Sequence, residues 1–397
     1  MKVFSHYIPC LLFLWFAHGL SQKRQQVDIP DFYLEQAIRS HFDKPTGAIT
    51  ATDLQSLTRF VAVGRGITSL KGLEHAKNLT YLRLDNNHIK DLSALADLVS
   101  LTYLNLNGNE IQSLDQIRNL SRLKTLSFDR NQITDISALH KLKKLKSITG
   151  HFNDITDLSV IANWKQLTHF NMGFNRLRDL TPFKKLDKLE GIWIPDNQID
   201  DIGALSHLLD LEVLILEKNP ISDIAALSGL TKIVQLNLMD TQITDFGPLA
   251  NITSIGVLVL GQNDITAIDF LKGLTNIEWL DLRDNQITDI SVLKKLPKLK
   301  KLFLSGNAIR SIVPLADQHQ LRWVLLENNQ IDNLWPLYNL TELTDLMLHN
   351  KPLTITATLA DTNNTVIQKI KSDGKNVALN PFEINSIYQM EPSKKLK

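Results

Sequence analysis

Carboxylate side chains recur at intervals of 22 residues along most of this 397-residue chain. A row of carboxylates could line a metal site, because hard cations prefer oxygen ligands. However, Ser and Asn replace Asp freely at this position, as they do where short polar side chains cap the first turn of a helix. We therefore expect these side chains to cap short 3₁₀ turns rather than to bind metal. The residues at this position are Ser69, Asp91, Ser113, Asp135, Asp157, Asp179, Asp201, Asp223, Asp245, Ala267, Asp289, Ser311 and Asn333.

No other pattern of reactive residues predicts catalysis. The 11 His residues lack the spacing of metal ligands, and there is no Gly-rich phosphate loop or nucleophile motif. Lysine clusters such as "LKKLPKLKK" are scattered along the chain, and the net charge is only +1, which argues against nucleic acid as a partner. The sequence therefore predicts a protein without enzyme activity, metal or cofactor.

The 22-residue interval also governs the apolar residues, and it decides the fold. The first leucine of the repeat, or an isoleucine in its place, recurs from Leu57 to Leu343 at fourteen starts, without insertion or deletion. One unit of this length cannot bury its own apolar side, so neighbouring units must stack into a continuous core. The pattern predicts an α/β solenoid in the form of an arc or horseshoe. A parallel β-sheet should line its concave face, and short 3₁₀ turns its convex face.

Asparagine occupies the ninth position of eleven repeats. The chain must turn after each strand, which leaves backbone N–H and C=O groups inside the coil. An amide side chain can donate to one such group and accept from another. We therefore predict a structural ladder, which Thr241 interrupts. Its members are Asn87, Asn109, Asn131, Asn153, Asn175, Asn197, Asn219, Asn263, Asn285, Asn307 and Asn329.

Side chains at the third, fifth and seventh positions of each repeat should point away from the core, because strand residues alternate between two faces. These positions are free of folding constraints, so their composition carries the functional signal. We interpret twelve of them as a solvent-facing ligand-binding surface: Tyr81, Tyr103, Trp193, Ile215, Val257, Trp279, Asp281, Arg283, Phe303, Trp323, Leu325 and Met347.

The later repeats make this surface unusually apolar and aromatic. Trp, Tyr, Phe, Met and Arg are enriched in interface cores, so we expect a protein or peptide ligand anchored by Trp193, Trp279, Phe303 and Trp323. Three alternatives remain open. The aromatic residues could stack on sugars, as in a glycan-binding envelope protein. They could be covered by neighbours or by the C-terminal tail, or the chain could be a structural envelope component without a dedicated ligand.

The unit "LxxLxLxxNxIxDIxxL" resembles the leucine-rich repeat of bacterial internalins. The segment "IPDFYLEQAIRSHFDKPTGAITATDLQSLTRF" resembles the helical N-terminal cap of that family. Asp31 should begin one cap helix, and Thr50 with Asp53 should form a capping box for a second. The resemblance implies a leucine-rich repeat solenoid whose first repeat is covered by a helical cap.

Residues 1–19 have the lysine, apolar run and small residues of a secretory signal peptide, and they hold the single cysteine, Cys10. We expect a helical cap over residues 20–56, a solenoid of about 14 repeats over 57–356, and a C-terminal cap and polar tail over 357–397. The final segment "YQMEPSKKLK" contains no Leu-Pro-x-Thr-Gly sorting signal. The expectation is an exported monomer that is secreted, periplasmic or associated with the cell surface. It should have no membrane span and no covalent attachment to the cell wall.

Overall fold

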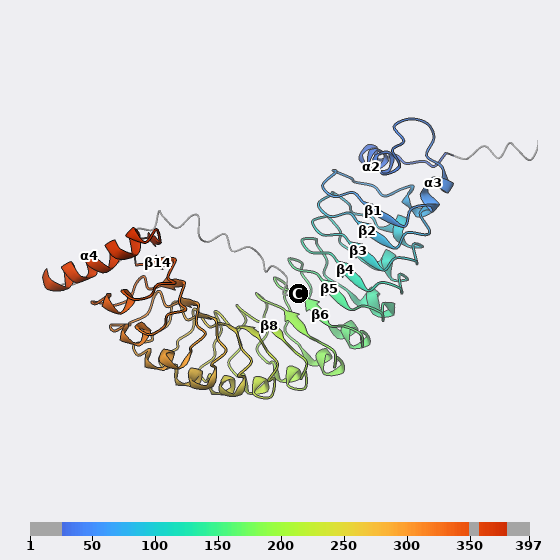
Figure 1. Cartoon of the computed structure of the whole chain (residues 1–397). Coiled ribbons are helices and arrows are strands. Elements are labelled where there is room, and N and C mark those ends of the chain that lie inside the picture. Colours follow the sequence, from blue (N-terminus) through green and yellow to red (C-terminus); the bar gives the residue numbers. More distant parts are fainter. Residues whose placement is uncertain (1–25, 349–356, 379–397) are drawn as a thin grey trace, which may run out of the picture. The chain divides into compact units, whose positions relative to one another are not determined.

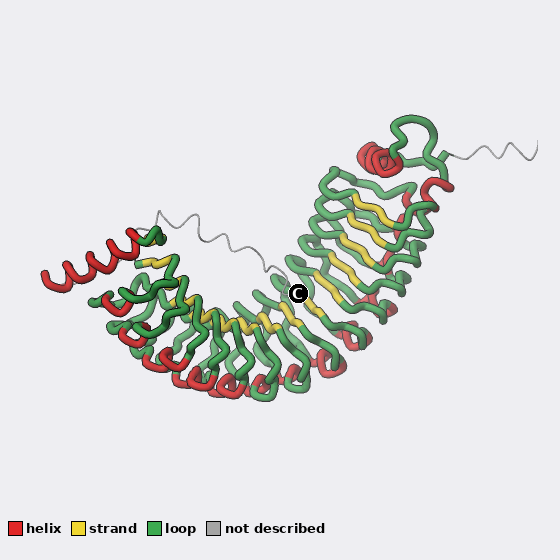
Figure 2. The backbone as a smooth tube through the Cα atoms, in the orientation of Figure 1, coloured by secondary structure: helices red, strands yellow, loops and turns green. Residues whose placement is uncertain are grey.

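The computed structural model describes residues 26–348 and 357–378, which belong to two compact units. Unit 1 ends at Asn153, and unit 2 begins at Asp154. The predicted signal peptide and the polar tail after residue 378 lie outside the described residues. Within each unit, successive strands lie side by side in chain order, and the 3₁₀ segments line the opposite side of the coil (Figures 1 and 2).

Unit 1 contains the N-terminal cap and the first repeats. Its cap helices are α2 (Phe32–Phe42) and α3 (Ala51–Gln55). Its strands are β1 (Arg59–Val61), β2 (Tyr81–Arg83), β3 (Tyr103–Asn105), β4 (Thr125–Ser127) and β5 (Ser147–Thr149). Its 3₁₀ turns are η1 (Leu73–His75), η2 (Ser93–Leu95), η3 (Asp115–Ile117) and η4 (Ser137–Lys141).

Unit 2 contains the later repeats and a C-terminal helix and strand. Its strands are β6 (His169–Asn171), β7 (Gly191–Trp193), β8 (Val213–Ile215), β9 (Gln235–Asn237), β10 (Val257–Val259), β11 (Trp279–Asp281), β12 (Lys301–Phe303), β13 (Trp323–Leu325), β14 (Asp345–Met347) and β15 (Asn376–Ala378). Its 3₁₀ turns are η5 (Ser159–Asn163), η6 (Thr181–Lys185), η7 (Gly203–Leu205), η8 (Ala225–Leu227), η9 (Gly247–Asn251), η10 (Asp269–Gly273), η11 (Ser291–Lys295), η12 (Val313–Leu315) and η13 (Trp335–Leu337). Helix α4 spans Ala357–Ser372.

The strands pair in parallel with the register that the repeat predicts. Trp279 on β11 lies opposite Lys301 on β12, which lies opposite Trp323 on β13. The leucines at the first, fourth and sixth positions are buried, as the 0% exposure of Leu280 and Leu282 illustrates. The predicted leucine-rich solenoid with a parallel sheet and 3₁₀ turns is therefore confirmed.

The asparagine ladder satisfies backbone groups inside the coil as predicted. Asn109 Nδ2 donates to Leu84 O in the preceding repeat (3.0 Å) and to Leu106 O in its own repeat (2.9 Å). Its Oδ1 accepts from Ile89 N–H at 3.1 Å. Each amide thus ties two neighbouring repeats together.

Thr241 interrupts the ladder, and the backbone adapts locally. Without an amide oxygen from Thr241, Ile221 N–H donates to Asn219 O (2.8 Å) within its own turn. The Thr241 hydroxyl lies 2.8 Å from Asn263 Oδ1 and 3.2 Å from Leu238 O. The gap therefore leaves no orphaned N–H at Ile221.

From Asp91 onward the polar thirteenth-position side chains cap the described 3₁₀ turns, with one refinement, whereas Ala267 has no polar group to do so and Ser69 accepts from Lys71 N–H, which lies before η1. Asp289 Oδ1 accepts from the backbone N–H of Ser291, the first residue of η11, at 2.8 Å. Asp135 makes the equivalent bond to Ser137 N–H at 2.7 Å. The capping residue therefore lies two positions before the N–H that it accepts from, and an apolar residue stands between them.

Each of the strands β1 to β13 is followed by a residue with positive φ at the eighth repeat position. Only Gly64, Gly108 and Gly306 are glycines there; the others are Asn86, Arg130, Phe152, Phe174, Asp196, Lys218, Asp240, Gln262, Asp284 and Asn328. Eight of these thirteen residues are Gly, Asn or Asp, which adopt the left-handed conformation most readily. The other five, including Phe152 and Phe174, show that the stacked coil imposes the turn even where the residue type disfavours it.

The N-terminal cap forms as predicted. Asp31 caps α2 through Leu34 N–H (2.9 Å) and also accepts from the Thr68 and Ser69 N–H groups of the first repeat (2.7 and 3.0 Å). Thr50 forms the expected capping box of α3. One carboxylate thus joins the cap helix to the solenoid.

At the other end, α4 and β15 cover the last described repeats. Asn363 on α4 is 1% exposed, accepts from Leu334 N–H (2.8 Å) and donates to Asp332 O (2.9 Å). Strand β15 pairs in parallel with β14, so a strand from outside the regular repeats extends the sheet.

Candidate ligand-binding face of the sheet

We call the outer surface formed by the third, fifth and seventh repeat positions the sheet face. In unit 2, three residues of this face form a ladder along the third position. Lys301 Nζ lies 4.8 Å from the centre of the Trp279 ring and 4.1 Å from that of Trp323. The lysine on β12 is therefore held between the indoles on β11 and β13. Such cation–π contacts stabilise the arrangement by about 0.5–1 kcal/mol each where solvent is near.

The fifth-position residues beside this ladder are buried. Phe303, Leu325 and Met347 form one apolar cluster, with exposures of 6%, 5% and 1%, and Trp279 and Trp323 pack against it. The prediction that these three side chains face solvent is wrong. Parallel strands lie only about 4.8 Å apart, so large side chains on one face cover one another.

Asp281 and Arg283 form a closed pair next to Trp279. Arg283 donates from Nε and Nη2 to the Asp281 carboxylate, with a shortest distance of 2.7 Å, and its guanidinium lies 5.5 Å from the Phe303 ring centre. Asp281 is 2% exposed, so it is also not the solvent-facing group that the sequence predicts. This carboxylate forms an ion pair with Arg283 and is too buried to contact a ligand directly.

Trp193 lies elsewhere on the face of unit 2, on β7. A Cβ added to Gly191 would fall 2.2 Å from a carbon of the Trp193 ring, so the indole lies over the glycine. The ring also stacks on His169, with centroids 5.9 Å apart. Ile215 is 8% exposed, contrary to prediction, whereas Val257 is half-buried. Glycine at the third repeat position, which is the first residue of β7, thus provides the space in which the indole lies flat on the sheet.

The sheet face of unit 1 has a different character. Tyr81 and Tyr103 stack with centroids 4.3 Å apart, and the Arg59 guanidinium lies 3.7 Å from the Tyr81 ring centre. Burial, with the neighbouring Tyr81, raises the pKa of Tyr103. Arg83 forms a two-bond ion pair with Asp85. The tyrosines are therefore half-buried in polar surroundings.

Two polar atoms on the sheet face of unit 2 are buried without a hydrogen-bond partner. They are Trp279 Nε1 and Asn171 Oδ1. The sequence predicts Trp279 as a contact residue, but the predicted binding residues do not include Asn171 and Lys301, because a repeat pattern does not show which polar atoms pair. A search of residues 26–348 and 357–378 finds no cluster of three or more His, Cys, Asp or Glu suited to a metal ion. No helix among those residues is long and apolar enough to cross a membrane.

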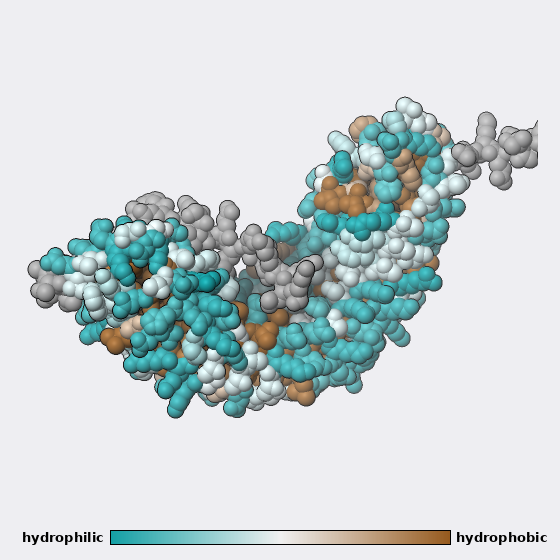
Figure 3. Space-filling model, viewed as in Figure 1, coloured by the Kyte–Doolittle hydropathy of each residue, from teal (hydrophilic) through white to brown (hydrophobic). Residues whose placement is uncertain are grey.

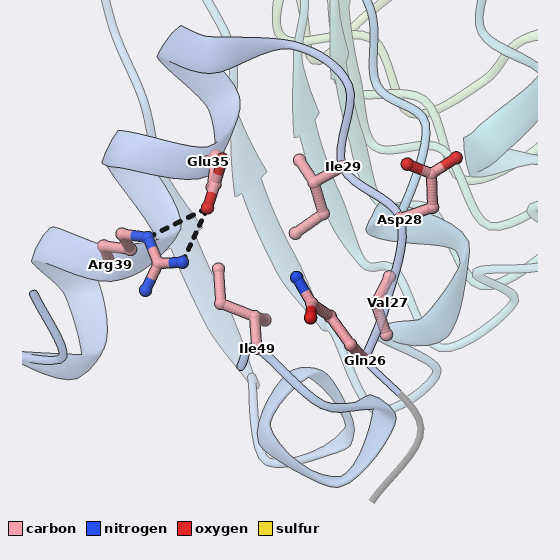
Figure 4. A pocket seen from close by; sticks show the side chains of 7 residues that line it. All are labelled: Gln26, Val27, Asp28, Ile29, Glu35, Arg39 and Ile49. Atoms are coloured by element: carbon pink, nitrogen blue, oxygen red, sulfur yellow. Dashed lines mark hydrogen bonds and ion pairs between the residues drawn. The ribbon is translucent and has the colours of Figure 1, made fainter. Parts of the chain in front are cut away.

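A hollow of about 290 Å³ lies at the N-terminal cap, lined by residues 26–29 with Glu35, Arg39 and Ile49 (Figure 4). Arg39 is fully engaged there. It pairs with Glu35 (2.6 Å) and donates to Lys44 O and Gly47 O at 3.3 and 3.0 Å. These contacts stabilise the cap, and they leave Arg39 few hydrogen-bond donors for a ligand.

Elsewhere, hydrophilic residues cover most of the visible surface of both units (Figure 3).

Parallel strands repeated every 22 residues, 3₁₀ turns and an internal asparagine ladder define a leucine-rich repeat protein. The family model described as Leucine Rich repeats (2 copies) matches residues 77–121, 99–139, 210–251 and 275–317. The chain is 32% identical to an internalin (InlF) from Listeria monocytogenes, over 80% of this chain and 95% of that one, with a TM-score of 0.77. The chain belongs to the internalin family.

Two further solved structures are similar. Internalin C2 from Listeria monocytogenes is 31% identical, with coverage of 58% of this chain and 94% of that one and a TM-score of 0.50. The leucine-rich repeat ectodomain of the Arabidopsis thaliana receptor kinase GASSHO1/SCHENGEN3, in complex with CASPARIAN STRIP INTEGRITY FACTOR 2, shares the fold at 21% identity. That comparison covers 77% of this chain and 43% of that one, with a TM-score of 0.61. A search of curated proteins found no match.

Proposed function

We propose that the chain is an exported, non-catalytic scaffold that binds a protein or peptide ligand on the sheet face of unit 2. The observation that carries the proposal is the pair of half-exposed indoles, Trp279 and Trp323, seated on the buried cluster of Phe303, Leu325 and Met347. Tryptophan in a packed setting is the residue type that most often dominates binding energy.

The buried cluster supports binding even though it offers little contact area itself. An indole held by Phe303 on one side and Lys301 on another has few alternative rotamers. A ligand then loses less free energy to ordering that side chain, which otherwise costs about 0.5–1.5 kcal/mol per residue. The cluster therefore makes the tryptophans preorganised anchors.

A structure of the same fold supports this role. The Arabidopsis receptor ectodomain was solved in complex with CASPARIAN STRIP INTEGRITY FACTOR 2. The amino-terminal pattern of residues 1–19 supports export, and the absence of a spanning helix in the described segments is compatible with it.

Glycan binding on unit 1 is the second candidate. The stacked Tyr81 and Tyr103 lie among polar groups, including Asn107, which donates to Asp129 at 2.9 Å. Sugars favour such mixtures of aromatic rings and hydrogen-bonding side chains. The two candidates occupy different units, so mutations can separate them.

The test uses two double variants of the purified full chain. Proteins captured by the wild type are identified, purified and measured directly for binding to Trp279→Ala/Trp323→Ala and to Tyr81→Ala/Tyr103→Ala. We expect the tryptophan variant to lose at least about 30-fold in affinity, since a hot spot contributes about 2 kcal/mol or more. Equal affinity of the tryptophan variant and the wild type would refute the proposal. Saturable binding on a glycan array, lost only in the tyrosine variant, would favour the second candidate.

A further inference from the structure

Lys301 differs from Arg283, the other Lys or Arg residue at the described sheet-face positions of unit 2. Arg283 pairs with Asp281. Lys301 forms no ion pair among the residues that the structure describes, and its ammonium contacts only the rings of Trp279 and Trp323. A half-buried ammonium without a counter-ion retains its capacity to donate hydrogen bonds to an anion.

The carboxylates of the same region are buried by neighbouring side chains. Asp281, Glu327 and Asp345 are only 2%, 4% and 9% exposed. Asp281 is paired with Arg283, Glu327 accepts from the Ser305 hydroxyl, and Asp345 accepts from Asn376 at 2.9 Å. The exposed, unpaired charge that a ligand meets on these strands is therefore the Lys301 ammonium, although the described sheet-face positions from β11 to β14 hold three acidic residues against two basic ones.

Trp279 adds a second unsatisfied donor. Its Nε1 is buried and has no hydrogen-bond partner. Buried polar groups are nearly always paired, so an unpaired donor calls for an acceptor that the isolated chain does not supply. Both unmet donors lie on facing residues of β11 and β12. Because Trp279 Nε1 is buried, only the Lys301 ammonium can meet an acceptor without movement of the indole, and the ligand segment that lies over it should carry an acceptor group.

We propose that Lys301 binds the carboxylate of an Asp or Glu side chain in an extended segment of the protein ligand. This inference rests on the proposed function and specifies the chemistry of its ligand. The indoles hold the ammonium on two sides, limit its rotamers and exclude water, all of which strengthen an ion pair. The apolar segments beside the acidic residue would lie on the faces of Trp279 and Trp323.

The experiment selects peptides from a random library on the full-length chain. All peptides are acetylated and amidated, so that the only carboxylates are those of Asp and Glu side chains. Selection runs in parallel on the wild type, on Lys301→Met and on Lys301→Arg. The matched control is Lys300→Met, because Lys300 is the exposed neighbour that pairs with Glu278 at 2.8 Å. Thermal melting checks that each variant is folded.

We expect the wild type and Lys300→Met to select peptides that share one acidic residue, and Lys301→Met to lose that preference. Changing the shared residue to its amide should weaken binding to the wild type about tenfold and leave binding to Lys301→Met nearly unchanged. Lys301→Arg should retain part of the preference for peptides with the acidic residue.

Any of three results would overturn the inference. If the wild type selects peptides without an acidic preference, or Lys301→Met retains that preference, the carboxylate contact is absent but peptide binding by the sheet face stands. If the wild type selects no more peptides than Trp279→Ala/Trp323→Ala does, the inference and the proposed function fail together.

Discussion

Replacing Asn285 by Leu tests the physical role of the asparagine ladder. Leucine has the same branched shape as asparagine but can neither donate nor accept. Asn285 Nδ2 donates to the carbonyls of Leu260, Leu282 and Arg283 at 2.9–3.1 Å, and its Oδ1 accepts from Ile265 N–H at 3.1 Å. The substitution removes all four bonds.

The loss in the free energy of unfolding depends on which backbone groups lose their last hydrogen-bond partner. Each of the three carbonyls retains a second donor, since Asn263 Nδ2, Asn307 Nδ2 and Gln262 N–H bond to them at 3.0, 2.9 and 2.7 Å. Only Ile265 N–H is orphaned. An unsatisfied buried donor costs about 1–3 kcal/mol, which is therefore the expected loss in the free energy of unfolding.

Urea denaturation measures the loss, and hydrogen exchange of the Ile265 amide locates it. The matched control is Thr241→Val. This substitution removes the hydroxyl at the ninth repeat position and keeps the shape of the side chain. It orphans nothing, because Leu238 O retains Asn263 Nδ2 and Asn263 Oδ1 retains Thr241 N–H. We expect it to cost less than about 1 kcal/mol. Equal losses for the two variants, or an Ile265 amide that remains protected in Asn285→Leu, would refute the reasoning.

Three further predictions concern the cap and the sheet face. Burial alone would raise the pKa of Asp31, but hydrogen bonds from Leu34, Thr68 and Ser69 outweigh it and lower the pKa. The stability from this carboxylate is therefore present above about pH 4 and lost as pH falls through the folded pKa. Asp31→Asn should melt lower than wild type at pH 7, and the difference should vanish in strong acid; a constant difference would contradict this. Gly191→Ala should displace the Trp193 indole and weaken a ligand that contacts it several-fold, with a small change in melting temperature; unchanged tryptophan fluorescence would argue against the clash. Leu280→Ala should cost about 2–5 kcal/mol in urea denaturation. Trp279→Ala should cost only about 1–2, from one aromatic and one cation–π contact, and the reverse order would disprove the assignment of core and face.

Much of the fold follows from local spacing. The apolar positions predict stacked coils because one 22-residue unit cannot bury them alone. The ninth-position asparagines and the thirteenth-position Asp, Ser and Asn residues are equally predictable, because each answers a backbone requirement that recurs with the coil. Asn109 and Asp289 do in the structure what their positions imply.

The site was only partly predictable. The spacing correctly places Trp279, Phe303 and Trp323 on one side of the sheet, but it does not reveal that Phe303 is covered while the indoles remain half-exposed. Burial on that face depends on which side chains stand on neighbouring strands, and those residues are 22 positions apart. The same applies to Lys301, whose significance comes from two indoles on different repeats.

The sequence by itself determines the class of fold, the register of the strands and the residues that satisfy the coil, because these depend on a repeated local pattern. Tertiary structure alone decides the left-handed turn at residues as ill-suited as Phe152, the joining of the N-terminal cap to the first repeat by Asp31, and the pairing of β15 with β14. It also decides which polar groups on the sheet face already have an ion-pair or hydrogen-bond partner and which, like the Lys301 ammonium, can still donate hydrogen bonds. The reason is physical: these properties arise from contacts between repeats, and no single repeat contains both partners.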